Sequence, residues 1–294
     1  LSEIPKSRAA YFRLLLFPHP LIVDYGYNQL PYCSFANPLV WLSVIFHIGV
    51  LVALVYYTFR RHWLAFALGF YLLHLVLINN FFFNIGAPLG ERLIFHSSLG
   101  FAMVAAWALV KAVGYVGSSR LQPIVLWGAV IVITVLCAGK TITRNADWKN
   151  DETLFAQALT VSPNSVLVNN NVAWALMKQA LAETDTSHKR ELLGKAVALL
   201  HKAVTIYPDY ASAYINASIA YLQLVQPDSA VANLAQARRL YPSHPRLPEL
   251  YYSAGALYYQ QHRGQQAADA WQATLQLQPG FAPAQQALNA LMGK

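Results

Sequence analysis

Charged residues are scarce in this sequence. Asp, Glu, Lys and Arg make up 12% of the 294 residues, whereas an ordinary soluble domain has roughly 25%. Cysteine is nearly absent too, and Cys33 and Cys137 cannot form a disulfide framework. The sequence also has no Gly-rich phosphate loop, no Cys/His metal cluster and no nucleophile elbow. Together with a hydrophobic content of 56%, these absences exclude a single soluble globule and predict no metal site.

The first half of the chain contains four long stretches without a charged residue. Each can hold the roughly 17–25 apolar residues that cross a bilayer. The predicted spans are Pro38–Phe59, Trp63–Phe83, Ile94–Val110 and Pro123–Gly139. Residues 1–143 carry nine Lys or Arg against three Asp or Glu. This basic excess indicates flanks that contact membrane lipid and argues against nucleic acid as a partner.

A short apolar run precedes the spans. Tyr11–Phe17 is too short to cross a bilayer and is followed by prolines at 18, 20 and 31. This pattern predicts an interfacial helix and an irregular loop over residues 1–37. The chain starts at Leu1 and lacks the pattern of a signal peptide, so we expect it to be a piece of a longer protein.

Basic residues in the links between spans predict the topology. Arg60 and Arg61 join the first two spans, and Lys111 and Arg120 flank the link between the last two. The positive-inside rule places both links in the cytoplasm. The other side also carries basic residues, such as Arg92, so this rule alone does not decide the orientation. With an even number of spans, residues 1–37 and the C-terminal half lie on the same side of the membrane. We expect both outside the cytoplasm, in the periplasm or the lumen of the endoplasmic reticulum.

From Trp148 onward the sequence changes to short amphipathic helices with an internal repeat. Pro208, Pro242 and Pro279 close successive units at separations of 34 and 37 residues, close to the tetratricopeptide period. With each proline counted as position 32, position 20 is always alanine, as expected where two helices approach closely. These alanines are Ala196, Ala230 and Ala267.

Two units also share the aromatic and small residues of that repeat. Tyr214, Ala217, Ser218 and Tyr221 correspond to Tyr251, Ala254, Gly255 and Tyr258. The preceding unit is eleven residues longer, and the polar run Glu183–Arg190 predicts an insertion between its helices. Ala282–Met292 is the expected capping helix. The predicted fold class is all-α, with transmembrane helices over residues 38–143 followed by a tetratricopeptide α-solenoid over residues 144–294.

The start of the third span is the most unusual segment. Glu91 and Arg92 directly precede its apolar run, and His96, Ser97 and Ser98 lie just inside. Charges so near the hydrocarbon are costly unless they are paired or hydrated. One hypothesis is a site for a lipid phosphate held by Arg92 and oriented by Glu91. The alternative is a helix cap and interfacial anchor.

The same segment carries a family resemblance. ERLIFHSSLGF, Glu91–Phe101, resembles the ER-L-L-Y-L-P-S-I-G-F motif of the tetratricopeptide-containing transmembrane O-mannosyltransferases, which are C-type integral-membrane glycosyltransferases. Ser97 replaces the proline of that motif and His96 an aliphatic residue. YFRLLLFPHPLIVDYG, Tyr11–Gly26, and RNADWKNDETLF, Arg144–Phe155, resemble two further segments of the family.

The resemblance covers this chain but only the C-terminal part of the family. It implies a polyprenyl-phosphate sugar, usually mannose, as donor substrate, with no cofactor in this chain. It also implies a catalytic base in an early extracytoplasmic loop that has no counterpart here, so the catalytic residues are unknown. Asp24 is a weak candidate, because the first 90 residues hold only one other acid, Glu3. A turn residue is the better interpretation of Asp24.

The repeats offer a candidate binding surface. Asn171 and Asn216 both occupy position 6 of the first helix in their units, where side chains face the concave surface. Amides there can hydrogen-bond the backbone of an extended acceptor peptide. The alternative to peptide binding is that two asparagines occur here because of helix polarity alone.

In the spans, His47 and His74 are expected to be neutral, hydrogen-bonded packing residues.

Three functions are compatible with these features. The preferred one is the C-terminal part of a glycosyltransferase that moves a sugar from a polyprenyl phosphate to protein hydroxyls while the repeats present the acceptor. The second is a membrane-anchored scaffold without catalytic activity whose repeats recruit protein partners. The third is an O-antigen-ligase-like membrane enzyme.

Overall fold

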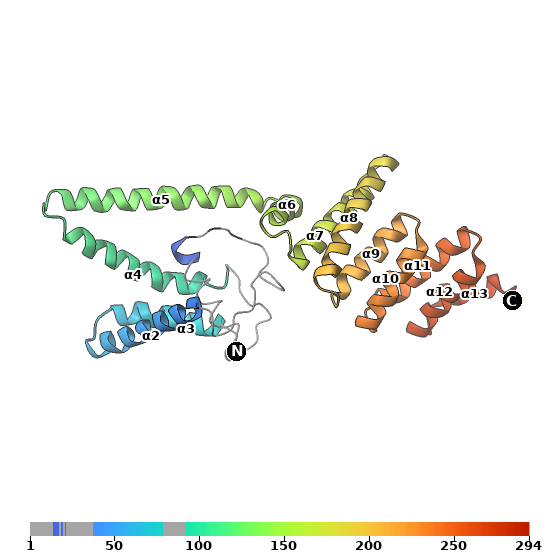
Figure 1. The fold of residues 1–294 in the computed structure, drawn as a ribbon, viewed down its shortest axis with the longest axis horizontal. Helices are drawn as coiled ribbons and strands as arrows, with labels where there is room; N and C mark the ends of the chain where they lie inside the picture. Colours follow the sequence, from blue (N-terminus) through green and yellow to red (C-terminus); the bar gives the residue numbers. More distant parts are fainter. Residues whose placement is uncertain (1–13, 18, 20, 22–37, 79–91, 294) are drawn as a thin grey trace. The chain divides into compact units, whose positions relative to one another are not determined.

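The computed structural model describes residues 14–17, 19, 21, 38–78 and 92–293. Every regular element in these residues is a helix, so the predicted all-α fold is confirmed (Figure 1). The chain divides into two compact units, residues 1–154 and 155–294.

The first unit contains four apolar helices, α2 (Pro38–Phe59), α3 (Leu64–Ile78), α4 (Phe95–Gly114) and α5 (Leu121–Asp147). Within the described residues, three helices are long and apolar enough to cross a membrane, namely Val40–Phe59, Phe95–Gly114 and Leu121–Asp147. The second predicted span is represented by α3, an apolar helix of 15 residues. The rest of that span, residues 79–83, lies outside the described residues.

Helix α5 is longer than the span predicted for it. The sequence predicts Pro123–Gly139, whereas the helix continues to Asp147. Its last turn is stabilised by Arg144, whose guanidinium lies 3.2 Å from the Asp147 carboxylate. Position 143, the predicted end of the membrane region, therefore lies inside a continuous helix.

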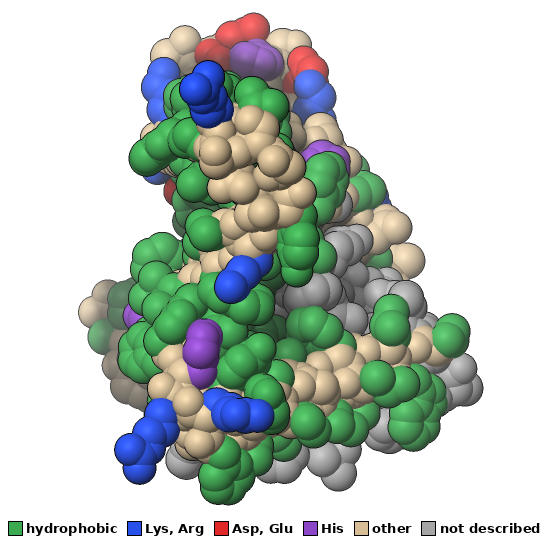
Figure 2. Space-filling model, turned by 90° about the vertical axis from the view of Figure 1, so that its left-hand side faces the viewer, with side chains coloured by type: hydrophobic (Ala, Val, Ile, Leu, Met, Phe, Trp, Pro, Cys, Tyr) green, Lys and Arg blue, Asp and Glu red, His purple; other side chains and the backbone are tan. Residues whose placement is uncertain are grey.

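The links between the apolar helices carry basic residues. The turn from α2 to α3 and the connection from α4 to α5 lie at the same end of this unit, on the left of Figure 1. Arg60 and Arg61 lie in the first link, and Lys111, in the last turn of α4, and Arg120 flank the second. All four side chains are exposed. Figure 2 faces this end and shows Lys and Arg side chains beside helices covered with hydrophobic ones. This arrangement fits a charged membrane surface at one end of an apolar layer.

Helices α3 and α4 cross with their backbones in contact. A Cβ at Gly100 would lie 2.5 Å from the carbonyl oxygen of Ala67 and 2.8 Å from the backbone nitrogen of Tyr71. Only glycine permits this approach, which is typical of helix pairs in membranes. Leu14, in the described part of the predicted interfacial helix, packs with Tyr71 and Ile94.

The second unit is a series of antiparallel helices that begins within the last turns of α6 (Asp151–Val161). The others are α7 (Val166–Ala182), α8 (Thr186–Ile206), α9 (Ala211–Gln223), α10 (Pro227–Leu240), α11 (Leu247–Gln260), α12 (Gly264–Leu277) and α13 (Ala282–Leu291). The alanines predicted at position 20, Ala196, Ala230 and Ala267, are all fully buried. The hypothesis of closely packed helix pairs is therefore confirmed.

The long first unit of the solenoid has no inserted loop. Its extra residues lengthen both helices, so that α7 has 17 residues and α8 has 21. The predicted insertion Glu183–Arg190 is wrong in this respect, because its second half forms the first turns of α8. Asp185 begins that helix, and its carboxylate accepts a hydrogen bond from the Ser187 backbone nitrogen at 2.9 Å. A strong N-cap signal inside a polar run thus favours helix.

The turns within two units repeat the same strained backbone. Val225 and His262 each lie two residues before the second helix of a unit and have φ of 60° and 57°. In both turns the next residue donates a backbone hydrogen bond to the carbonyl oxygen of the tyrosine five residues back, Tyr221 in one unit and Tyr258 in the other. This is the arrangement that ends a helix in a left-handed residue, usually glycine. Its recurrence 37 residues later is independent support for the repeat.

Candidate functional site

The first candidate site lies where α3 ends and α4 begins. The contact at Gly100 holds the two helices together, and His74 of α3 and His96 of α4 consequently lie side by side. Their imidazole rings are parallel within 10°, with centroids 5.5 Å apart. His74 also contacts Phe70, with the two ring centroids 4.1 Å apart. The sequence predicted His96 for this site but indicated only a packing role for His74.

Hydrogen bonding fixes the tautomer of His74. Its Nδ1 lies 2.9 Å from the carbonyl oxygen of Phe70 and must donate to it. In the neutral ring, Nε2 is then an acceptor, and on protonation it becomes a donor. His74 is half-buried and His96 is exposed. The pair therefore presents one oriented imidazole and one accessible imidazole at the end of the helix pair.

Arg92 lies one turn before α4. It is exposed, and its carbonyl oxygen accepts a long hydrogen bond of 3.4 Å from the Phe95 backbone nitrogen. Ile94 occupies the N-cap position and provides no side-chain hydrogen bond to the first turn. The positive end of α4 is thus accompanied by a permanent positive charge, and an anion is favoured there.

The two serines of this turn differ from each other. Ser98 donates its hydroxyl hydrogen to the Phe95 carbonyl oxygen at 2.6 Å, which leaves its oxygen only as an acceptor. Ser97, which the sequence placed in this segment but not among the residues that hold the phosphate, is fully buried. Its Oγ has no hydrogen-bond partner within the described residues. Glu91 and Asp24, the two acidic candidates, lie outside the described residues.

His47 has the packing role that the sequence predicted. Its Nδ1 donates to the Ser43 carbonyl oxygen at 2.7 Å, and its Nε2 lies 3.4 Å from the Tyr71 hydroxyl. The ring is buried. His47 therefore connects α2 to α3.

Among the described residues no group of three or more His, Cys, Asp or Glu could hold a metal ion.

The second candidate site is a cluster of amides on the solenoid. Asn216 of α9 donates through Nδ2 to Oδ1 of Asn170 at 2.9 Å, and Asn170 donates to Oδ1 of Asn171 at 3.3 Å. Asn171 and Asn216, the two predicted residues, are thus connected through a third amide that was not predicted. The available signal was its place at position 5 of the helix, next to the asparagine at position 6. Asn170 is buried, and the other two side chains are half-buried.

A neighbouring asparagine has a different role. Asn169 is fully buried and donates to the carbonyl oxygens of Pro163 and Ser165, at 2.9 and 2.6 Å. It holds the turn that precedes α7.

Trp174, one turn after the amides, is 45% exposed. Asn170, Asn171 and this indole all belong to α7, and the amide that bonds Asn170 comes from α9.

Further along the solenoid, one ion pair links two units. Asp228 of α10 accepts hydrogen bonds from both terminal nitrogens of Arg263 at 2.7 Å and from the Tyr258 hydroxyl at 2.9 Å. These donors, Arg263 first, hold the pKa of Asp228 below its usual range. Burial, followed by the hydrogen bond to Asp228, raises the pKa of Tyr258 to about 12. This cluster stabilises the junction and offers no free nucleophile.

Comparison with known proteins finds similarity to protein O-mannosyl-transferases of the TMTC type. It is 28% identical over 164 residues to the mouse protein O-mannosyl-transferase TMTC3, a match that covers 56% of this chain and 16% of the relative. It is 25% identical over 237 residues to Drosophila melanogaster Tmtc3, covering 78% and 24%. The chain is TMTC-like. It spans a quarter or less of the length of these relatives, and no family model matches it.

Solved structures similar to this TMTC-like chain have low sequence identity to it. MamA is 21% identical with a TM-score of 0.40, and the match covers 53% of this chain and 82% of MamA. TTC0263, a thermophilic tetratricopeptide protein of Thermus thermophilus, is 17% identical with a TM-score of 0.38, covering 67% and 93%. The repeat assignment itself rests on the buried alanines and the recurring turns described above.

Proposed function

We propose that the chain is the C-terminal part of a membrane glycosyltransferase that moves mannose from a polyprenyl phosphate to protein hydroxyls. The repeats lie outside the cytoplasm and present the acceptor. The names of the similar proteins support the reaction class. The catalytic base is supplied from outside the described residues.

The observation that carries the proposal is the stacking of His96 on His74 of α3, near in sequence to Arg92 in the turn that precedes α4. Arg92 provides a permanent charge with paired donors that match phosphate oxygens. His96 is stacked on His74, and this contact restrains an imidazole that can donate to a second oxygen. The apolar helices α3 and α4 lead away from this point, as a polyprenyl chain attached to that phosphate requires.

The amide cluster supplies the acceptor side of the proposal. Amides donate and accept, so they bind peptide backbone without selecting a side-chain sequence. Asn171 and the exposed indole of Trp174 both belong to α7, and their spacing of one helical turn places them on neighbouring parts of the helix surface. An acceptor held there by its backbone keeps its serine and threonine hydroxyls available.

Donor binding by the chain tests the first half of the proposal. Arg92→Ala should weaken the binding of polyprenyl phosphate mannose to the chain in phosphatidylcholine nanodiscs by at least about tenfold, since a charged hydrogen-bonded pair contributes about 1.5–3 kcal/mol. Lys111→Ala, at the other end of α4, is the matched control and should bind normally. Equal affinity of both variants would show that Arg92 is an interfacial anchor.

Acceptor binding tests the second half. Asn171→Ala removes an amide that is proposed to bind the peptide, so it should weaken peptide binding. Because the hydrogen bond from Asn170 to Asn171 is long, 3.3 Å, its loss should leave the free energy of unfolding unchanged. Asn216→Ala also breaks the 2.9 Å bond to Asn170 and should cost about 1 kcal/mol of stability. Asn233→Ala, an amide of α10 bonded within its own helix, is the control. A chain that binds peptide but no donor would support the scaffold function instead.

A further inference from the structure

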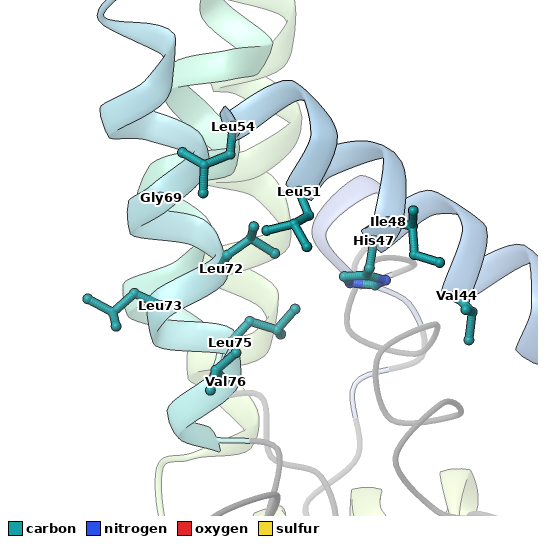
Figure 3. A pocket seen from close by; sticks show the side chains of 10 residues that line it. All are labelled: Val44, His47, Ile48, Leu51, Leu54, Gly69, Leu72, Leu73, Leu75 and Val76. Carbon is teal, nitrogen blue, oxygen red and sulfur yellow. The ribbon is translucent and has the colours of Figure 1, made fainter. Parts of the chain in front are cut away.

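Helices α2 and α3 enclose a groove that is separate from both candidate sites. They are close at Leu54 and Gly69 and diverge toward Val44 and Val76, as Figure 3 shows. The volume between them is about 480 Å³, within the range of sites that hold a small organic molecule. From Val44 to Leu54 the groove runs along ten residues of α2, about 15 Å of helix, or half of a bilayer's hydrocarbon core.

The lining of this groove is aliphatic apart from one side chain. That side chain is His47, and both of its ring nitrogens are already engaged, with the Ser43 carbonyl oxygen and the Tyr71 hydroxyl. The remaining lining residues are Val44, Ile48, Leu51, Leu54, Gly69, Leu72, Leu73, Leu75 and Val76. Such a lining offers nothing to water, to a headgroup or to a peptide backbone, because apolar cavities stay dry.

The open side of the groove is continuous with exposed apolar surface of α2 and α3. Ile48, Leu51 and Leu73 line the groove and are also 55%, 52% and 61% exposed. Farther around the same helices, Ile45 and Leu77 are exposed as well. In a bilayer this surface meets hydrocarbon, and an empty wedge beside it would forfeit the dispersion contacts of every wall atom.

We propose that this groove is a binding site for one acyl chain of a bilayer phospholipid, held between α2 and α3. The chain fills the wedge, contacts Leu72 and Leu51 on opposite walls, and takes the place of a side chain that neither helix supplies. Gly69 adds no side chain at the narrow end, where the Leu54 side chain lies. The site does not depend on the proposed transferase function.

Photolabelling tests the site directly. The full chain is placed in phosphatidylcholine vesicles that contain a phosphatidylcholine with a diazirine in its acyl chain, and the labelled residues are identified by mass spectrometry. We expect label on the groove residues Leu72 and Leu51 to exceed that on exposed residues of α5 such as Ile131 and Leu136. Uniform label over all exposed aliphatic residues would reduce the groove to ordinary lipid contact and overturn the proposal.

Two glycines provide matched variants. A Cβ at Gly69 would meet only Leu54, at 3.6 Å, so Gly69→Phe can extend into the groove without displacing the backbone. Gly49 on α2 has no atom within 4 Å of its Cβ position and is not a lining residue. Gly69→Phe should lower the groove label by more than half, and Gly49→Phe should leave it unchanged. An equal label in both variants would contradict the proposal.

A second variant and a competitor complete the test. If Gly69→Phe does not insert into the vesicles, Leu73→Trp narrows the groove from a position that is 61% exposed and little packed. Polyprenyl phosphate added at equal total lipid should leave the groove label unchanged. Loss of the groove label on addition of polyprenyl phosphate would assign the groove to an isoprenoid chain. Absence of lipid label from the lining residues in every experiment would assign the groove to another protein segment. Either result would overturn the proposal.

Discussion

The contact between Gly255 and Trp271 gives the most direct test of the solenoid packing. A Cβ at Gly255 would lie 2.5 Å from Cδ1 and 3.0 Å from Cε2 of the Trp271 indole. Trp271 is 3% exposed, and its Nε1 donates to the Tyr252 carbonyl oxygen at 3.2 Å. Gly255→Ala must therefore displace a buried indole and strain or break that hydrogen bond.

The expected loss follows from three contributions. Overpacking a core costs about 1–3 kcal/mol, and a lost hydrogen bond costs about 0.5–1.5 kcal/mol. Alanine regains about 1 kcal/mol of helix propensity. The net expectation is a free energy of unfolding lower by about 0.5–3.5 kcal/mol.

The same substitution at Gly194 is the control. Gly194 lies in the middle of α8, is exposed, and has nothing within 4 Å of its Cβ position. Gly194→Ala should raise the free energy of unfolding by about 0.5–1 kcal/mol. The assay is urea unfolding of the full chain in detergent, followed by circular dichroism. Equal effects of the two substitutions, in sign and size, would refute the packing derived for Gly255.

Three further predictions concern the solenoid. Ser165→Ala removes the Oγ that accepts from the Val168 backbone nitrogen at 3.1 Å, and the urea midpoint should fall by an amount corresponding to about 1 kcal/mol; an unchanged midpoint would contradict the capping role. Val225→Gly relieves the backbone strain of a β-branched residue at φ 60°. It should raise the thermal midpoint by an amount corresponding to about 1 kcal/mol. The same change at Val231, inside α10, should lower the thermal midpoint. Because Arg263 and then Tyr258 hold the pKa of Asp228 below its usual range, the stability from this cluster is complete above the unfolded pKa near 4 and is lost as pH falls through the folded value. Asp228→Asn should remove that part of the acid dependence of the urea midpoint, and an unaltered pH profile would show that the cluster contributes nothing.

Local signals in the sequence predicted most of the fold. Charge-free runs of sufficient length predicted α2 with its observed bounds, and the spacing of prolines and small residues predicted the repeat. Boundaries that depend on polar residues were less predictable. Helix α5 continues past Lys140 because nothing in that segment breaks a helix, and the polar run after Glu183 folds as helix because Asp185 caps it.

The candidate sites were only partly predictable because they depend on contacts between helices. His74 and His96 are 22 positions apart, and the packing of α3 against α4, close at Gly100, brings their rings together. The link from Asn216 to Asn170 likewise joins two repeat units. The groove between α2 and α3 depends on how far two apolar helices diverge, which no pattern of hydrophobic residues specifies.

Donor binding to a His74 variant tests the central claim most directly. His74 is proposed to act through its ring contact with His96, beside a phosphate held by Arg92. In nanodiscs, His74→Ala should weaken the binding of polyprenyl phosphate mannose, His74→Phe should restore part of it by preserving the stacked ring, and Arg92→Ala should abolish most of it. Unchanged affinity in all three variants, with correct insertion, would contradict a donor site at the start of α4.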